Sequence, residues 1–251
     1  MCTRLVSLVI DATDPAAAAR FWYIMLGGTA TPEPGGCRRL LAPDVGGSGL
    51  DLLFTPATAP KSAKNRIHLD LATESPHEYQ VLTSLAADVG AREVEVGQGA
   101  DVPWTVFHDP EGNEFCILEP DELYARTGPL AALVVDSAAP SAMAEFWSEA
   151  TGWPLAPSGE DGAAALRSSE TSGPWLEFLP VPDVQWRARR TARRGGNRIR
   201  FDVTTDGSGA DLDRLLELGA TELSERDANG IAWLADPEGN EFRLVPTHVR
   251  A

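Results

Sequence analysis

The sequence predicts an α+β protein built from two tandem domains, residues 1–120 and 128–248. The first observation is a heptapeptide, Asp-Pro-Glu-Gly-Asn-Glu-Phe, which occurs at 109–115 and again, unchanged, at 236–242. A repeat at this spacing indicates two copies of a domain-sized unit. The second observation is that the same order of strand-like and helix-like patterns precedes each heptapeptide. The composition, with 43% hydrophobic and 23% charged residues, is typical of a soluble globular protein.

Each copy opens with a strand followed by a helix. In the first copy, apolar residues at 5–10 predict the strand, and Asp14 before Pro15 predicts the start of the helix. Trp22 lies on the apolar stripe of that helix, which is expected to end at Gly27. We expect this tryptophan to be a core residue. The second copy shows the same signals, which are a strand at 131–135, Pro140, Phe146-Trp147 and Gly152.

Short strands, a longer strand, a second helix and two final strands complete each copy. The longer strands begin with Asn-Arg-Ile, at 65–71 and 197–203. Ser75 with Glu78, and Ser208 with Asp211, have the spacing of a helix-capping box. Each copy therefore reads as two βαβββ modules, with the heptapeptide as the turn between the last two strands. The short strands are expected at 38–42, 49–55, 163–168 and 174–180, and the linker between the copies at 120–128.

Charge and composition argue against several classes of function. A net charge of −16 argues against nucleic-acid binding, which requires surplus Lys and Arg. No apolar run reaches the length that spans a bilayer, so no membrane association is expected. The first residues have no signal-peptide pattern, and Cys2, Cys37 and Cys116 have no paired spacing. We therefore expect free thiols and a cytoplasmic location.

One segment opposes the acidic balance. Residues 186–200 hold seven of the 21 basic residues of the chain. A run of this kind is typical of a solvated loop. An anion site, or a contact for an acidic partner surface, is the alternative.

The Phe-Trp helix, the Asn-Arg-Ile strand and the Asp-Pro-Glu-Gly-Asn-Glu-Phe turn together resemble the vicinal oxygen chelate (VOC) superfamily. That superfamily includes glyoxalase I, bleomycin-resistance proteins and extradiol dioxygenases, and the chain looks most like its glyoxalase-like members. The resemblance covers 1–120 and 128–248. It implies that the two modules of each domain form a curved mixed sheet around a cleft for a substrate or metal. The heptapeptide is then interpreted as a turn near the site, since Pro fixes φ and Gly accepts a positive φ.

The resemblance also implies four metal-ligand positions on inward-facing strand residues of each copy, usually His or Gln, Glu, His and Glu. In the first copy these positions carry Ser7, Asp51 or Leu53, His68 and Cys116. In the second copy they carry Ala132, Trp175 or Glu177, Arg200 and Arg243. With one clear match, no metal or other cofactor is predicted. A divalent metal held by His68 with Asp51 or Cys116 is the alternative.

Aromatic and charged residues indicate what fills such a cleft without a metal. A tryptophan on a cleft strand gives a flat ligand a stacking surface, and rim or inter-domain packing is the alternative role. Arg200 and Arg243 are expected to face the second cleft, where they bind an anion or form a salt-bridge plug with Glu177 or Glu241. The tryptophans that the two copies do not share are Trp104, Trp153, Trp175, Trp186 and Trp233.

The preferred function is metal-independent binding of a small aromatic organic molecule, as in resistance or sequestration proteins. The alternative is a lyase, an isomerase or a ring-cleaving dioxygenase with a non-standard site around His68. In an enzyme without metal, His68 or Asp70 is the expected general base. Whether the protein is an enzyme, and whether it forms a homodimer beyond the packing of its two domains, stays open. The residues expected to contact the ligand are Ser7, Asp51, His68, Asp70, Trp104, Cys116, Trp175, Glu177, Arg200, Trp233 and Arg243.

Overall fold

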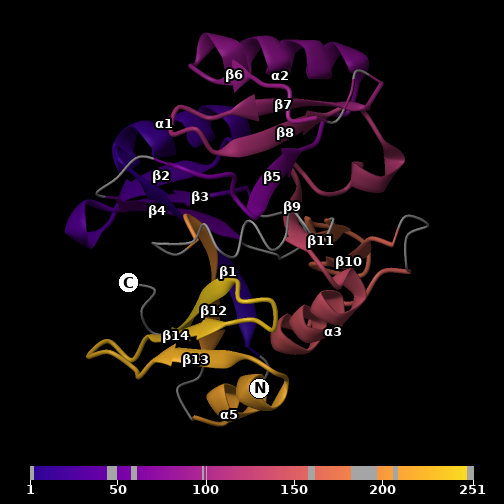
Figure 1. The fold of residues 1–251 in the computed structure, drawn as a ribbon. Coiled ribbons are helices and arrows are strands. Elements are labelled where there is room, and N and C mark those ends of the chain that lie inside the picture. The colour runs from indigo at the N-terminus through magenta and orange to yellow at the C-terminus, as the bar shows by residue number, and fades with distance from the viewer. Residues whose placement is uncertain are drawn as a thin grey trace.

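The computed structural model describes residues 3–43, 50–57, 61–97, 99, 101–157, 162–181, 197–205 and 209–247. Within these residues the chain forms two mixed β-sheets with helices packed against them, which confirms the α+β class (Figure 1). Most of the arginine-rich segment, with Trp186, lies outside the described residues. In the part that the structure describes, no helix has the length and apolarity to cross a membrane.

The strands form an eight-stranded and a seven-stranded sheet. The order in the eight-stranded sheet is β13 (Thr221–Ser224), β14 (Ala232–Ala235), β15 (Glu241–Pro246), β12 (Ile199–Thr205), β1 (Arg4–Ala12), β4 (Asp51–Pro56), β3 (Arg38–Leu41) and β2 (Thr29–Pro32). The order in the seven-stranded sheet is β10 (Ala164–Arg167), β11 (Trp175–Pro180), β9 (Leu130–Ser137), β5 (Ile67–Leu71), β8 (Glu114–Leu118), β7 (Trp104–His108) and β6 (Arg92–Glu93).

Each sheet takes one module from each copy. In the eight-stranded sheet β1 pairs with β12, and in the seven-stranded sheet β5 pairs with β9, both antiparallel. Figure 1 shows the indigo strand β1 beside the late strands of the chain. The expectation that both modules of one copy share a sheet is therefore corrected. The repeat could not decide the partnership, because every module has the same apolar pattern and either pairing buries it.

The second copy departs from the βαβββ pattern in its first module. Among the described residues of this module, two strands, β10 and β11, follow the helix. Before β10 the chain forms only an isolated antiparallel bridge, between Leu155 and Leu166. Pro154 and Pro157 flank this bridge and have no backbone N–H to donate, which limits the ladder at this point.

The helices begin where the sequence predicts. The carboxylate of Asp14 accepts hydrogen bonds from the first turn of α1. At α2 the hydroxyl of Ser75 accepts from the backbone N–H of Glu78, and the carboxylate of Glu78 accepts from the backbone N–H of Glu74, the residue before the cap. The second predicted box includes Ser208, which lies outside the described residues, and Asp211 there accepts from the hydroxyl of Thr205. The helices are α1 (Pro15–Leu26), α2 (Pro76–Asp88), α3 (Pro140–Thr151) and α5 (Ala210–Glu217), with short 3-10 helices η1 (Pro34–Gly36) and η2 (Glu122–Tyr124).

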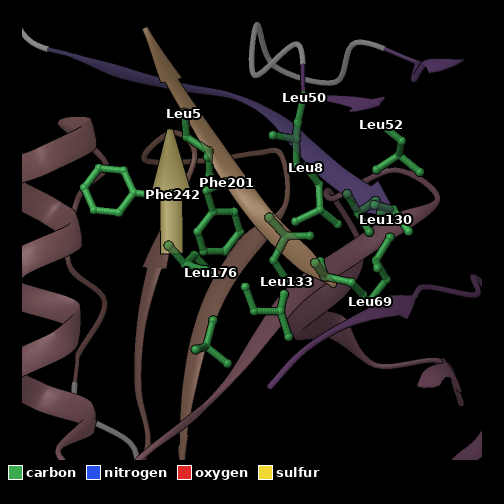
Figure 2. Close-up of a cluster of buried hydrophobic side chains, with 14 of the residues drawn as sticks. Leu5, Leu8, Leu50, Leu52, Leu69, Leu130, Leu133, Leu176, Phe201 and Phe242 are labelled. Atoms are coloured by element: carbon green, nitrogen blue, oxygen red, sulfur yellow. The ribbon is translucent and has the colours of Figure 1, made fainter. Parts of the chain in front are cut away.

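One continuous apolar core joins the two sheets. Figure 2 shows Leu8 of β1 and Phe201 of β12 in the same cluster as Leu69 of β5 and Leu133 of β9. The helices add their apolar stripes to this core. Trp22 and Trp147 are fully buried in it, as predicted.

The repeated turn is organised by its buried aspartate. Oδ1 of Asp109 accepts from the backbone N–H of Glu111 at 2.9 Å and of Asn113 at 2.8 Å. Oδ2 accepts from the amide of Asn113 at 3.0 Å and from the indole N–H of Trp22 at 3.2 Å. Asp236 makes the same four bonds with Glu238, Asn240 and Trp147. The heptapeptide thus serves as a structural turn that holds the first helix of its own copy.

The glutamate of the same turn links the two sheets. Glu111 precedes β8 of the seven-stranded sheet, and its carboxylate accepts from the backbone N–H of Thr13 and Asp14, which follow β1 of the eight-stranded sheet. Arg198, next to β12, donates to Glu111 at 2.9 Å. The second copy has the matching contacts: Glu238 accepts from Ala138 and Ala139, and Arg66 donates to the side chain of Asn240 at 2.7 Å.

Asp236→Asn is expected to lower the free energy of unfolding by about 1–3 kcal/mol, because an amide at Oδ2 would point an N–H at two other donors. Asp109→Asn should behave in the same way. The loss is expected although burial raises the pKa of Asp236 to about 6 and so disfavours its charge. Urea denaturation measures the effect, with the exposed Asp213→Asn as control. Equal stability of Asp236→Asn and the control would contradict this role.

Candidate functional site

The predicted ligand residues fall into two groups, one on each sheet, and each group contains residues of both copies. The first group, on the seven-stranded sheet, is His68, Asp70, Trp104, Cys116, Trp175 and Glu177; together with Tyr124 we call it the acidic site. The second group, on the eight-stranded sheet, is Ser7, Asp51, Arg200, Trp233 and Arg243; together with Asp11, Asp202 and Arg39 we call it the ion-pair site.

Strand register brings the residues of the acidic site together. Asp70 on β5 lies opposite Cys116 on β8 and opposite Ala132 on β9. On the next row, Glu177 on β11 lies two strands from His68, with Val134 of β9 between them. These side chains lie on the face opposite the apolar residues of β5 and β8 that enter the main core, since successive strand residues alternate between faces.

Three potential metal donors meet in the acidic site. Ligand atoms of His68, Asp70 and Cys116 all lie within 4.8 Å of one another, and Nε2 of His68 is 3.4 Å from Oδ1 of Asp70. The combination of His68 with Asp51 is not formed, because Asp51 belongs to the other sheet, where it pairs with Arg39 at 3.3 Å. Asp70 takes the place in the group that sequence reasoning gave to Asp51.

Burial and mutual repulsion dominate the electrostatics of the acidic site. Desolvation, reinforced by the charge of Glu177 and opposed by a hydrogen bond with Cys116, raises the pKa of Asp70 to about 7. Desolvation also raises the pKa of Glu177, with the hydrogen bond from Tyr124 acting in the opposite direction. The pKa of the Cys116 thiol is raised by burial and by the nearby Asp70. The thiol is therefore protonated at neutral pH and is not an activated nucleophile.

Aromatic and apolar groups surround these acids. The hydroxyl of Tyr124 donates to Oε1 of Glu177 at 3.1 Å, and the indole of Trp175 donates to the carbonyl oxygen of Leu123 at 3.3 Å. Tyr124 and the half-buried Trp104 pack against a small apolar cluster that contains Cys116. Sequence reasoning missed Tyr124, because it lies in the linker between the copies and the repeat gives it no counterpart.

Five residues of the ion-pair site form one row across the eight-stranded sheet. Register aligns Trp233 with Arg243, Arg243 with Asp202, Asp202 with Ser7, and Ser7 with Asp51. The two ends of the row are therefore separated by three strands, and every polar residue in it has a polar neighbour on the adjacent strand. Such cross-strand neighbours interact directly.

Arg243 in this row and Arg200, which pairs with Val9 of β1, each have an acidic partner. Arg243 makes a two-pronged contact with Asp202, at 2.7 and 2.6 Å, and Arg200 donates to Asp11 at 2.8 Å. The guanidinium groups of both arginines lie over the ring of Trp233, at 5.2 Å for Arg200 and 5.9 Å for Arg243. The expected partners Glu177 and Glu241 are wrong: Glu177 lies on the other sheet, and Glu241 accepts from the backbone N–H of Asn197.

A separate depression lies away from both groups. It is lined by apolar and neutral residues, including Leu26, Pro43, Leu50 and Pro129, and has no ionisable side chain. We therefore place the candidate chemistry in the acidic site and the ion-pair site.

The fold and the repeat define a protein of two VOC-type units. The sequence model of the glyoxalase-like domain family matches at residues 7–118 and again at 132–245, so the chain belongs to this family. The chain is similar in structure to glyoxalase I from Zea mays, with a TM-score of 0.66, 16% identity, and coverage of 97% of this chain and 92% of that chain. It is also similar to a Bacillus subtilis protein described as a “putative dioxygenase”, with a TM-score of 0.59, 15% identity, and coverage of 97% and 84%. No curated protein sequence matches significantly.

Asp70→Asn is expected to stabilise the protein above pH 7 by about 2–4 kcal/mol, and to have little effect near pH 4. The folded-state pKa, about 7, lies above the ordinary value of 3.8, so between these values the folded chain holds a proton that the unfolded chain has lost. Stability from this group therefore falls as pH rises from about 4 to 7, and an amide escapes that loss. Thermal unfolding of both proteins from pH 4 to 8 tests this. If the stability gain of Asp70→Asn does not change with pH, the Asp70 carboxyl does not have the raised pKa described here.

Proposed function

We propose that the acidic site binds a small organic molecule with a flat aromatic part, and that this binding does not depend on a metal. The observation that carries the proposal is the meeting of Trp175, Tyr124 and Trp104 with two carboxylates on one sheet face, the buried Asp70 and the half-buried Glu177. Aromatic walls around a few polar groups are typical of small-molecule sites, because the walls supply affinity and the polar groups fix orientation.

The ion-pair site supports this choice by contrast. Its arginines Arg200 and Arg243 are engaged by Asp11 and Asp202. A ligand would have to break charged hydrogen bonds that are already satisfied, which costs more than it returns in a partly buried setting. Of the two alternatives for Arg200 and Arg243, an anion-binding site and a set of internal salt bridges, we therefore favour the internal salt bridges.

The donor set argues for a metal-independent site. Ala132 has no ligand atom at the first-strand position, and Cys116 shares a hydrogen bond with Asp70. A thiol must lose its proton to bind a metal, and burial makes that loss unfavourable here.

A metal-dependent enzyme is the second candidate, and one observation favours it. His68, Asp70 and Cys116 are close enough to hold one divalent ion, and a set of nitrogen, oxygen and sulfur donors suits zinc. Bound there, the ion would supply Lewis-acid chemistry to a lyase, isomerase or oxygenase reaction. The chain's own groups near it would orient a substrate between Trp175 and Tyr124.

Trp175→Ala is expected to weaken binding of the neutral probe 2-naphthalenemethanol about 10-fold, because one stacking surface is lost. Trp233→Ala is the matched control, since Trp233 is also half-buried and also lies beside an arginine, and it should leave the affinity unchanged. Isothermal titration calorimetry measures both. If Trp233→Ala carries the loss instead, the proposed location is wrong.

Removal of divalent metal with EDTA is expected to leave the affinity for 2-naphthalenemethanol unchanged. Metal analysis of the purified protein and a titration with Zn²⁺ complete the test. Stoichiometric zinc, with a rise in melting temperature that His68→Ala abolishes, would favour the second candidate over the proposal.

A further inference from the structure

We infer that the ligand carries a positive charge, as an amine or amidine on its aromatic part, and that Asp70 and Glu177 bind this group. The inference rests on the proposed function and names the chemical class of its ligand. The comparison of the two copies supports the inference, because in the second copy the counterpart of Asp70 is neutralised by an arginine of the chain itself.

Asp70 has a buried acceptor atom without a hydrogen-bond donor. The residue is 8% exposed, and its Oδ1 accepts no hydrogen bond. Nε2 of His68 lies 3.4 Å from this atom, which is an ion-pair distance when the imidazole is protonated, but makes no hydrogen bond with it. A buried carboxylate oxygen in this condition is costly, and a donor from a bound molecule would remove the cost.

Glu177 adds a second carboxylate beside it. Its Oε1 accepts from the hydroxyl of Tyr124 at 3.1 Å, and the residue is half-buried. No Lys or Arg among the described residues forms an ion pair with Asp70 or with Glu177. Lys64, whose charge acts on Cys116, pairs with Asp136 at 3.0 Å. Arg167, on the edge strand β10, lies over Trp175 at 4.8 Å.

The second copy shows what is missing. Asp202 and Asp70 occupy the same position after the Asn-Arg-Ile start of their strands, and Arg243 and Cys116 occupy the same position after the repeated turn. Both pairs are also cross-strand neighbours. In the ion-pair site Arg243 donates two hydrogen bonds to Asp202. In the acidic site the matching residue is Cys116, whose thiol is neutral.

The acidic site therefore has the carboxylate of this pair without its cation, and Glu177 stands where the other sheet has Leu53. Register supports this last match, since Glu177 pairs with Val134 of β9 as Leu53 pairs with Val9 of β1. Relative to the Asp202–Arg243 pair, the acidic site lacks the guanidinium, and Glu177 brings a second carboxylate close to Asp70. A ligand with a protonated amine or amidine restores the balance, and its aromatic part lies against Trp175 and Tyr124.

Three naphthalenes of similar shape test the inference: 2-(aminomethyl)naphthalene, 2-naphthalenemethanol and 2-naphthoate. Calorimetry at pH 8 and low salt is expected to show the amine binding about 10- to 100-fold tighter than the alcohol, with the carboxylate weakest. Asp70→Asn and Glu177→Gln should each bring the amine to within about 3-fold of the alcohol. Glu122→Gln, which removes an exposed charge of the linker, is the control and should keep the preference.

A second set of variants copies the ion-pair site into the acidic site. Cys116→Arg should abolish the preference for the amine, because the new guanidinium pairs with Asp70, whereas Cys116→Ala should keep it. Should Cys116→Arg fail to fold, the two carboxylate variants still decide the matter.

The outcomes separate the two proposals. Equal affinity for the amine and the alcohol, with binding that still depends on Trp175, overturns the positive charge of the ligand and leaves the proposed function standing. Binding of no probe, or binding that Trp175→Ala does not change, overturns both.

Discussion

The buried aspartate of the repeated turn is the constraint on which the other parts of this molecule depend. Asp109 and Asp236 each accept two backbone and two side-chain hydrogen bonds, so each shapes its turn and holds a tryptophan of the first helix at the same time. A carboxylate is needed because all four partners are donors. The cost of burying it is offset by those bonds, which explains why the whole turn recurs unchanged while the strands around it have diverged.

The turns also connect modules that lie on different sheets and in different copies. Glu111 reaches the start of α1, and Arg66 and Arg198 each cross to the turn of the other copy. The modules of one copy are therefore held together by turns and helices, whereas modules of different copies are held together by strand pairing. Each sheet therefore contains strands from both halves of the chain. Each candidate site consequently takes residues from both halves.

Local signals in the sequence predicted the elements, and the repeat predicted most positions of the candidate site. Asp14, Ser75 and Gly152 mark helix ends through their own chemistry, so their roles follow from nearby residues alone. Counting from the repeated turn singled out Cys116 and Arg243, which the structure pairs with Asp70 and Asp202 on the neighbouring strands. The meeting of Asp70 with Glu177 did not follow, because it depends on which modules pair, and that choice is made by contacts far apart in the chain. Tyr124 could not be found either, since a linker has no periodic pattern.

The linker between β8 and β9 has a consequence for how the molecule assembles. Each half of the chain supplies only part of each sheet, so the halves are in effect two binding partners joined by the eleven residues 119–129. A short tether of this kind keeps the partners at millimolar effective concentration and turns their association into an intramolecular step. Because Tyr124 on this tether also contacts Glu177, the connection that brings the halves together ends up inside the site they build.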